Sequence, residues 1–93
     1  MDLKHLESIV RDRLEAVYIE LLDESSRHRG HAGSLAGGHL KALIVSPAFE
    51  NRALLERHRL VYEALRNEMS SGIHSLGLKT YTPEEWKSKQ AGW

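Results

Sequence analysis

The feature that most limits what this chain can fold into is the absence of cysteine from its 93 residues. A chain of this length forms one small domain, because two halves would each be too small to bury a core alone. Because the chain has no thiols, neither a disulfide nor a cysteine-bound metal could stabilise a domain of half this length. The sequence therefore predicts a single domain over residues 1–93. It also excludes a zinc or iron–sulfur site built from cysteines of this chain.

Positive and negative side chains balance, with 13 Lys and Arg against 13 Asp and Glu. A net charge of zero argues against bulk electrostatic capture of nucleic acid or an anionic membrane, but it allows a local basic patch. No apolar window approaches membrane-spanning length, and acidic residues interrupt the N-terminal region, unlike a signal or transit peptide. We expect a cytoplasmic protein with no membrane association, and a processed organelle protein would fit the same sequence.

The spacing of apolar residues changes along the chain, which predicts a mixture of helices and strands. Near the N-terminus and in the middle of the chain, apolar residues recur every three or four positions, as on one helix face. Stretches rich in β-branched residues lie between these segments. The predicted elements are, in order, helix 2–15, strand 16–23, a flexible loop over about 24–38, strand 39–46, helix 52–70, strand 73–80 and a short helix at about 83–89.

This order predicts an α+β fold with a three-stranded mixed sheet. The hairpin makes strands 16–23 and 39–46 antiparallel, and the helical crossover makes strand 73–80 parallel to strand 39–46. The helices then lie on one face of the sheet, and the other face is open to solvent or to a partner.

Two helical segments carry specific packing expectations. In helix 52–70, Leu54, Val61 and Leu65 share an apolar line that should pack on the sheet. The last helix begins at a Thr-Pro-Glu-Glu sequence, which predicts a capping box. Trp86 follows this cap and is expected to pack back on the domain.

The chain contains six histidines. His28 and His31 form a His-x-x-His spacing in the predicted loop, which alone is a weak metal signal because a site needs three or four ligands. His58 lies on the apolar line of helix 52–70, where a packed core-edge imidazole and a metal ligand are both open. If these histidines converge, they supply only part of a coordination shell, which another molecule would complete.

Arginines give the long helix a basic side. They are Arg52, Arg57, Arg59 and Arg66. Phosphate contact is one interpretation, with Glu56 as the only nearby acid, and a solvated helix face is the other. The chain has no Gly-x-Ser-x-Gly elbow, no P-loop and no Gly-x-Gly-x-x-Gly motif. We therefore expect a protein that is not an enzyme.

Five ordered blocks of the sequence resemble the BolA family. They read Asp23-Glu24-Ser25-Ser26-Arg27-His28, Ile44-Val45-Ser46-x-x-Phe49, Arg57-His58-Arg59-Leu60-Val61-Tyr62, Ile73-His74-Ser75-Leu76 and Thr82-Pro83-Glu84-Glu85-Trp86. The resemblance covers nearly the whole chain and implies a fold similar to the class II KH domain. A KH-type RNA site needs a Gly-x-x-Gly loop. None occurs near residues 49–52, so RNA binding of that kind is not expected.

The resemblance also implies a role and ligands. BolA-like proteins pair with monothiol glutaredoxins and share with them, and with glutathione, a bridging 2Fe–2S cluster used in cluster trafficking or iron and redox regulation. The family ligand in the Arg-His-Arg block falls on His58. The loop ligand falls on His28, with His31 as the alternative and His39 as the next candidate. We expect an iron–sulfur adaptor that, when alone, is a monomer or weak homodimer without a cofactor.

The resemblance leaves a second function open. Some BolA-like proteins are DNA-binding transcriptional regulators that act in stress responses. That role would use the basic helix around Arg57 and Arg59. Zero net charge weakens this alternative, and a steep loss of DNA affinity with salt would favour it.

Overall fold

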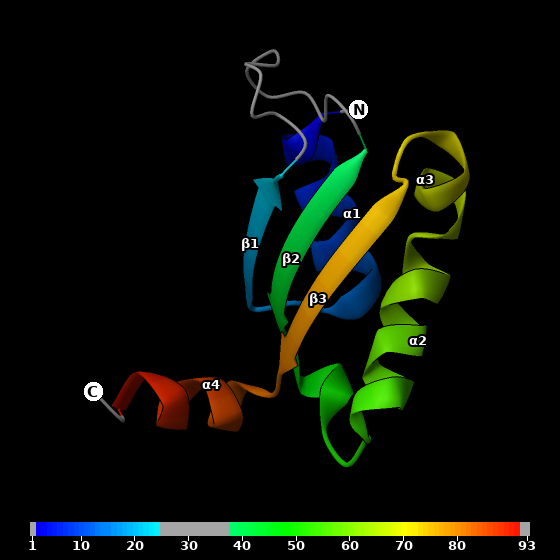
Figure 1. Ribbon diagram of the computed structural model, residues 1–93. Helices are drawn as coiled ribbons and strands as arrows, with labels where there is room; N and C mark the ends of the chain where they lie inside the picture. The colour runs from blue at the N-terminus through cyan, green and yellow to red at the C-terminus, as the bar shows by residue number, and fades with distance from the viewer. Residues whose placement is uncertain (1, 25–37, 92–93) are drawn as a thin grey trace.

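The computed structural model describes residues 2–24 and 38–91. Helices and strands follow one another in the predicted order (Figure 1). The bounds are α1 Leu3–Leu14, β1 Tyr18–Asp23, β2 His39–Val45, η1 Pro47–Phe49, α2 Leu54–Ala64, α3 Arg66–Ser71, β3 Ser75–Tyr81 and α4 Pro83–Ala91. Within the described ranges, no helix is long and apolar enough to cross a membrane.

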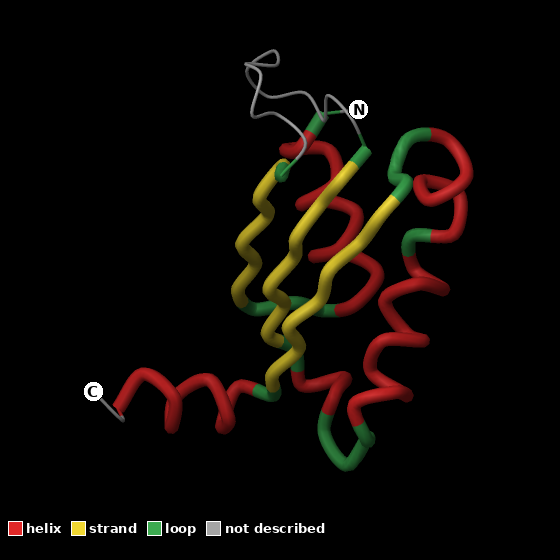
Figure 2. The backbone as a smooth tube through the Cα atoms, viewed as in Figure 1, coloured by secondary structure: helices red, strands yellow, loops and turns green. Residues whose placement is uncertain are grey.

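The three strands form one mixed sheet in the order β1-β2-β3. β1 pairs antiparallel with β2, and β2 pairs parallel with β3, as the hairpin and the crossover predict. α1 and α2 lie on the same side of the sheet (Figure 1 and Figure 2). On its other side, α4 contacts the sheet only at one end, where Trp86 packs on Tyr18 and Tyr81, within the residues that the structure describes. The predicted α+β fold with helices on one face is therefore confirmed.

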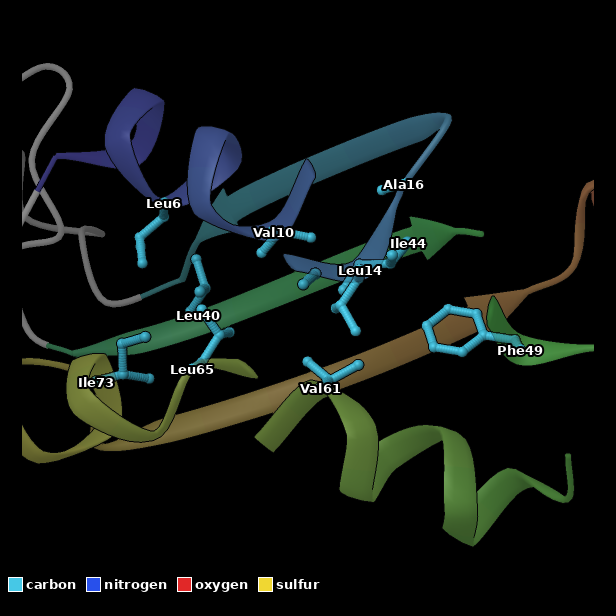
Figure 3. Packing of buried hydrophobic residues seen from close by; sticks show 11 residues of the cluster. Leu6, Val10, Leu14, Ala16, Leu40, Ile44, Phe49, Val61, Leu65 and Ile73 are labelled. Carbon is cyan, nitrogen blue, oxygen red and sulfur yellow. The ribbon is translucent and has the colours of Figure 1, made fainter. Parts of the chain in front are cut away.

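One apolar core fills the space between the sheet and the helices (Figure 3). α1 contributes Leu6, Val10 and Leu14, whose spacing of four residues puts them on one helix face. Alternate residues of β2 point into the same core. The core residues are Leu6, Val10, Leu14, Ala16, Leu40, Ala42, Ile44, Phe49, Val61, Leu65 and Ile73.

The single helix predicted over residues 52–70 is two helices in the structure. α2 ends at Ala64 and α3 begins at Arg66, because the backbone of Leu65 leaves the helical region with φ −105° and ψ 20°. Leu65 is fully buried. The chain therefore changes direction at a residue whose side chain is held in the core, which apolar spacing alone does not reveal.

The start of α2 also differs from the prediction. Val61 and Leu65 are fully buried as predicted, whereas Leu54 is 61% exposed. The expectation that Leu54 packs on the sheet is wrong, because it begins the helix at the end of the core. Phe49, from the turn η1, is fully buried and fills that end instead (Figure 3). Ser46 forms this turn by accepting a hydrogen bond from the backbone two residues later.

α4 runs past the end of the sheet (Figure 1). Its predicted capping box is present: Thr82 N donates to Glu85 Oε1 at 2.9 Å, and Glu85 N donates to Thr82 Oγ1 at 3.1 Å. The Trp86 ring stacks on Tyr18 at a centroid distance of 5.3 Å and lies 5.4 Å from Tyr81. Trp86 therefore packs back on the domain, as predicted.

Candidate functional site

Two histidines lie at the end of the sheet where the loop between β1 and β2 attaches. His39 opens β2 and pairs in the ladder with Ser75, and His74 directly precedes Ser75. The backbone N atoms of His74 and Ser75 both donate to the Gly38 carbonyl, at 2.7 and 3.0 Å. Both histidines are exposed. We call this site, defined by Gly38, His39 and His74, the histidine edge.

Gly38 allows the His74 ring to lie close to the backbone. Its φ of +80° is in the left-handed region, which favours glycine. A Cβ at this position would lie 2.2 Å from Cδ2 of His74 and 2.8 Å from the carbonyl oxygen of Gly72. The conformation at the end of the loop and the place of the His74 imidazole therefore depend on each other.

The loop that carries the other two candidate histidines begins and ends at this edge. Glu24 N donates to the His39 carbonyl at 2.9 Å, so both loop attachments lie at the same end of the sheet. His28 and His31 lie outside the described residues, as does most of the loop predicted to be flexible.

His58 lies away from the histidine edge. The adjacent Arg57 donates to the Thr80 carbonyl at 3.3 Å. Thr80 is five residues along β3 from Ser75, or about 17 Å at the usual rise of a strand. The Nε2 atom of His58 is buried and has no hydrogen-bond partner among the described residues. The structure therefore places His58 as a core-edge imidazole on α2 and does not bring it together with His39 and His74.

The donor atoms of the histidine edge fit a shared metal group better than a self-contained one. In the part of the chain that the structure describes, no group of three or more His, Cys, Asp or Glu side chains could hold a metal ion. The edge offers two imidazoles, which are suitable ligands for iron in Rieske-type 2Fe–2S centres. Because the chain has no cysteine, thiolate ligands would come from another molecule.

The candidates from the sequence do not include His74, although it stands in one of the family-like blocks. The predicted strand topology, and not the residues next to His74 in the sequence, could have identified it as a candidate. A parallel pair places the starts of its two strands at the same end of the sheet. The residue before β3 therefore lies beside the point where the loop joins β2.

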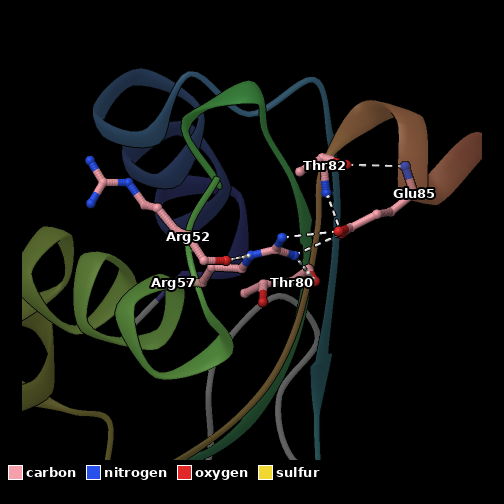
Figure 4. A network of polar contacts seen from close by, with 5 residues as sticks. All are labelled: Arg52, Arg57, Thr80, Thr82 and Glu85. Atoms are coloured by element: carbon pink, nitrogen blue, oxygen red, sulfur yellow. Dashed lines mark hydrogen bonds and ion pairs between the residues drawn. The ribbon is translucent and has the colours of Figure 1, made fainter. Parts of the chain in front are cut away.

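Arg57 belongs to a polar network that joins α2 to α4 (Figure 4). Its guanidinium donates to both carboxylate oxygens of Glu85, at 2.7 and 3.0 Å, and to the Arg52 and Thr80 carbonyls. This ion pair lowers the pKa of Glu85 to about 2. The Arg57 side chain is only 12% exposed. The expectation that Glu56 is the only nearby acid is therefore wrong, and Arg57 is not free to contact phosphate.

The other three arginines of the predicted patch differ in the hydrogen bonds and ion pairs that their guanidinium groups make. Arg66 pairs with Glu63 at 2.6 Å on the surface. Arg52 donates through Nε to the Ala48 carbonyl at 3.1 Å, and its guanidinium points away from the Arg57 network (Figure 4). Arg59 is exposed and makes no ion pair with the residues that the structure describes. The unpaired part of the patch is therefore Arg52 and Arg59.

A family model described as BolA-like protein matches residues 10–85. The chain belongs to the BolA family. The DNA-binding transcriptional regulator BolA of Escherichia coli (strain K12) is 39% identical over 87 residues, which cover 94% of this chain and 81% of that protein. The chloroplastic protein BOLA1 of Arabidopsis thaliana is 40% identical over 84 residues, covering 86% of this chain and 52% of that protein. This chain thus spans about half the length of the Arabidopsis BolA relative.

Solved BolA structures have the same fold. The BolA domain of SufE1 from Arabidopsis thaliana aligns with a TM-score of 0.74 at 36% identity, covering 88% of this chain and 92% of that chain. A BolA-like protein from Babesia bovis aligns with a TM-score of 0.79 at 33% identity, covering 97% and 94%. The family resemblance inferred from the sequence blocks is therefore confirmed.

Proposed function

We propose that this BolA-family chain is an adaptor without catalytic activity that binds a monothiol glutaredoxin and shares a bridging 2Fe–2S cluster with it. The observation that carries the proposal is the histidine edge. His39 and His74 present exposed imidazoles at the place where the loop containing His28 and His31 is attached. The absence of cysteine suits a chain that contributes imidazoles and takes its thiolates from a partner and glutathione.

The part of this chain in the complex is to present neutral imidazole nitrogen at a fixed place. His74 is the ligand that the geometry favours, because the β2–β3 ladder and Gly38 fix its backbone and the position of its ring. The second ligand would come from His39, His28 or His31. When bound, the cluster would supply one-electron chemistry or iron for delivery. Because imidazole must be neutral to bind a metal, acid would weaken the complex.

Co-expression with a monothiol glutaredoxin tests this proposal. We expect a stable complex whose visible absorption and circular dichroism differ from those of the glutaredoxin homodimer, because imidazole replaces thiolate at the iron. The chain purified alone should be colourless. A glutaredoxin whose active-site cysteine is replaced by serine is the matched control and should yield no coloured complex. If the coloured fraction has the spectrum of glutaredoxin alone and lacks this chain, the proposal is wrong.

A second function is supported by the names of relatives. Curated BolA relatives from Escherichia coli and Haemophilus influenzae are named DNA-binding transcriptional regulators. In this chain, Arg52 and Arg59 are the arginines of the basic helix whose guanidinium groups are not ion-paired within the described residues. We propose DNA binding through these two side chains as the alternative role.

For this alternative, Arg59→Ala is expected to weaken DNA binding at every sequence tested and to lower the salt slope by about 1, as the loss of one phosphate contact does. Fluorescence anisotropy over a series of salt concentrations measures both. Arg11→Ala on α1 is the control, because Arg11 is exposed but pairs with Glu7. Equal binding by the Arg59→Ala variant and the wild type would remove α2 from the DNA-binding surface.

A further inference from the structure

On the side of the sheet that faces away from α1 and α2, two rows of side chains lie between the row of His39 and Ser75 and the row of Tyr18, Val45 and Tyr81. Ladder partners point to the same side of a sheet, so the register defines each row. The side chains line a shallow cavity of about 310 Å³. Figure 1 is viewed onto this side. The two rows, which we call the open face, are Leu22, Lys41 and Gly77, and Glu20, Leu43 and Lys79.

The first row has a projecting side chain at one edge and a hollow at the other. Leu22 on β1 is 56% exposed. Gly77 on β3 has no side chain, and the fold does not require glycine there. Its φ is not in the left-handed region, and among the described residues an added Cβ would meet only Lys41 Cγ, at 3.4 Å. Glycine inside a strand weakens it and often marks a place where another molecule approaches closely.

The second row has opposite charges at its two edges. Glu20 on β1 and Lys79 on β3 are both exposed, and they flank Leu43. The Tyr18 hydroxyl donates a hydrogen bond to the Glu20 carboxylate, which orients it. Lys79 makes no ion pair with the described part of the chain. In each row, the position on β1 is therefore complementary to the position on β3: the projecting Leu22 to the hollow at Gly77, and the negative Glu20 to the positive Lys79.

We infer that the open face binds a second copy of this chain, face to face, about a two-fold axis parallel to β2. Rotation about this axis places the β1 edge of one copy over the β3 edge of the other. It does not shift the two copies relative to each other along the strands. Leu22 of each copy then lies over Gly77 of the other, and Glu20 over Lys79. Each contact forms twice, as in any isologous interface. Apolar burial and charge complementarity both follow from the observed register.

The remaining features of the face indicate a weak dimer. Lys41 lies near the axis, and Glu24, at 3.7 Å, compensates its charge. From the strand spacings, the face measures roughly 15 by 20 Å. This is well below the ~800 Å² per partner of a standard interface. His39 lies two residues before Lys41 and therefore on the same side of the sheet, so the dimer interface borders one imidazole of the histidine edge and is not independent of cluster binding.

Sedimentation velocity of the purified chain, from micromolar to millimolar concentration, tests the inference. We expect reversible dimerisation, which Lys79→Glu weakens about tenfold by placing carboxylates opposite each other twice. Glu20→Lys should have a similar effect, and the Glu20→Lys/Lys79→Glu double variant should restore the dimer. Lys4→Glu on the exposed side of α1 makes the same change of charge and should have no effect.

Gly77→Val provides a test without a change of charge. Valine suits a strand, so the fold should be retained, but it fills the hollow that Leu22 would enter and should weaken the dimer about tenfold. A wild-type chain that stays monomeric throughout the concentration range overturns the inference, and the face would then serve a different partner. A dimer that Lys79→Glu does not weaken, or that the double reversal does not restore, also overturns it.

Discussion

Gly38→Ala is expected to lower the free energy of unfolding by about 3 kcal/mol, through backbone strain and a steric clash together. The strain arises because φ at this position is +80°, which L-residues rarely adopt. The clash arises because the new Cβ would lie 2.2 Å from Cδ2 of His74 and 2.8 Å from the Gly72 carbonyl. In a domain of this size, such a loss corresponds to a melting temperature lower by about 12–24 °C. Urea unfolding followed by far-ultraviolet circular dichroism measures it.

Gly77→Ala is the matched control for this prediction. It makes the same chemical change in β3, but within the described part of the chain the new Cβ would meet only Lys41 Cγ, at an ordinary contact distance of 3.4 Å. We expect a change within about 0.5 kcal/mol, or a small gain, because glycine weakens a strand. Equal stabilities for the two variants would show that Gly38 does not hold the strained, crowded conformation described here.

The elements that could be predicted from the sequence are those determined by local pattern. The spacing of Leu6, Val10 and Leu14 identifies the buried face of α1 before any partner is known. The capping box between Thr82 and Glu85 involves residues three positions apart, so sequence alone determines it. Sheet topology followed from the lengths of the connections between strands.

The features that sequence reasoning missed depend on contacts between distant segments. Leu54 continues the apolar spacing of α2, but Phe49 from the preceding turn takes the place it would fill. Arg57 resembles a free surface cation in the sequence, because its partner Glu85 is 28 residues away. The proximity of His74 to Gly38 likewise arises only when β3 pairs with β2.

His74→Ala is expected to reduce the cluster retained by the glutaredoxin complex by at least about tenfold, since it removes the proposed ligand whose position the fold fixes. The exposed ring makes little contact with the core, so the fold should be preserved. The measurement is iron and visible absorbance per complex after gel filtration, together with the melting temperature of the chain. Retention of the full imidazole-type spectrum would exclude His74 as a ligand.

His58→Leu, compared with His74→Ala, decides whether the ligand outside the loop is His58 on α2 or His74 at the histidine edge. The family resemblance places the ligand at His58, whereas the geometry favours His74. Because Nε2 of His58 is buried and no described residue bonds to it, an apolar side chain of similar size should leave the free energy of unfolding within about 1 kcal/mol or raise it. We expect the complex of this variant to keep its cluster.

The loop ligand can be identified in the same assay, with His28→Ala, His31→Ala and His39→Ala compared in parallel. His28 is expected to matter more than His31, because a ligand closer to the end of β1 requires fewer residues to be ordered, at about 1–2 kcal/mol each. If neither loop substitution changes the spectrum and His39→Ala does, the two imidazoles of the histidine edge form the ligand pair. If His58→Leu alone removes the signal, α2 must approach the loop in the complex, and the separation of about 17 Å along β3 would have to close on binding.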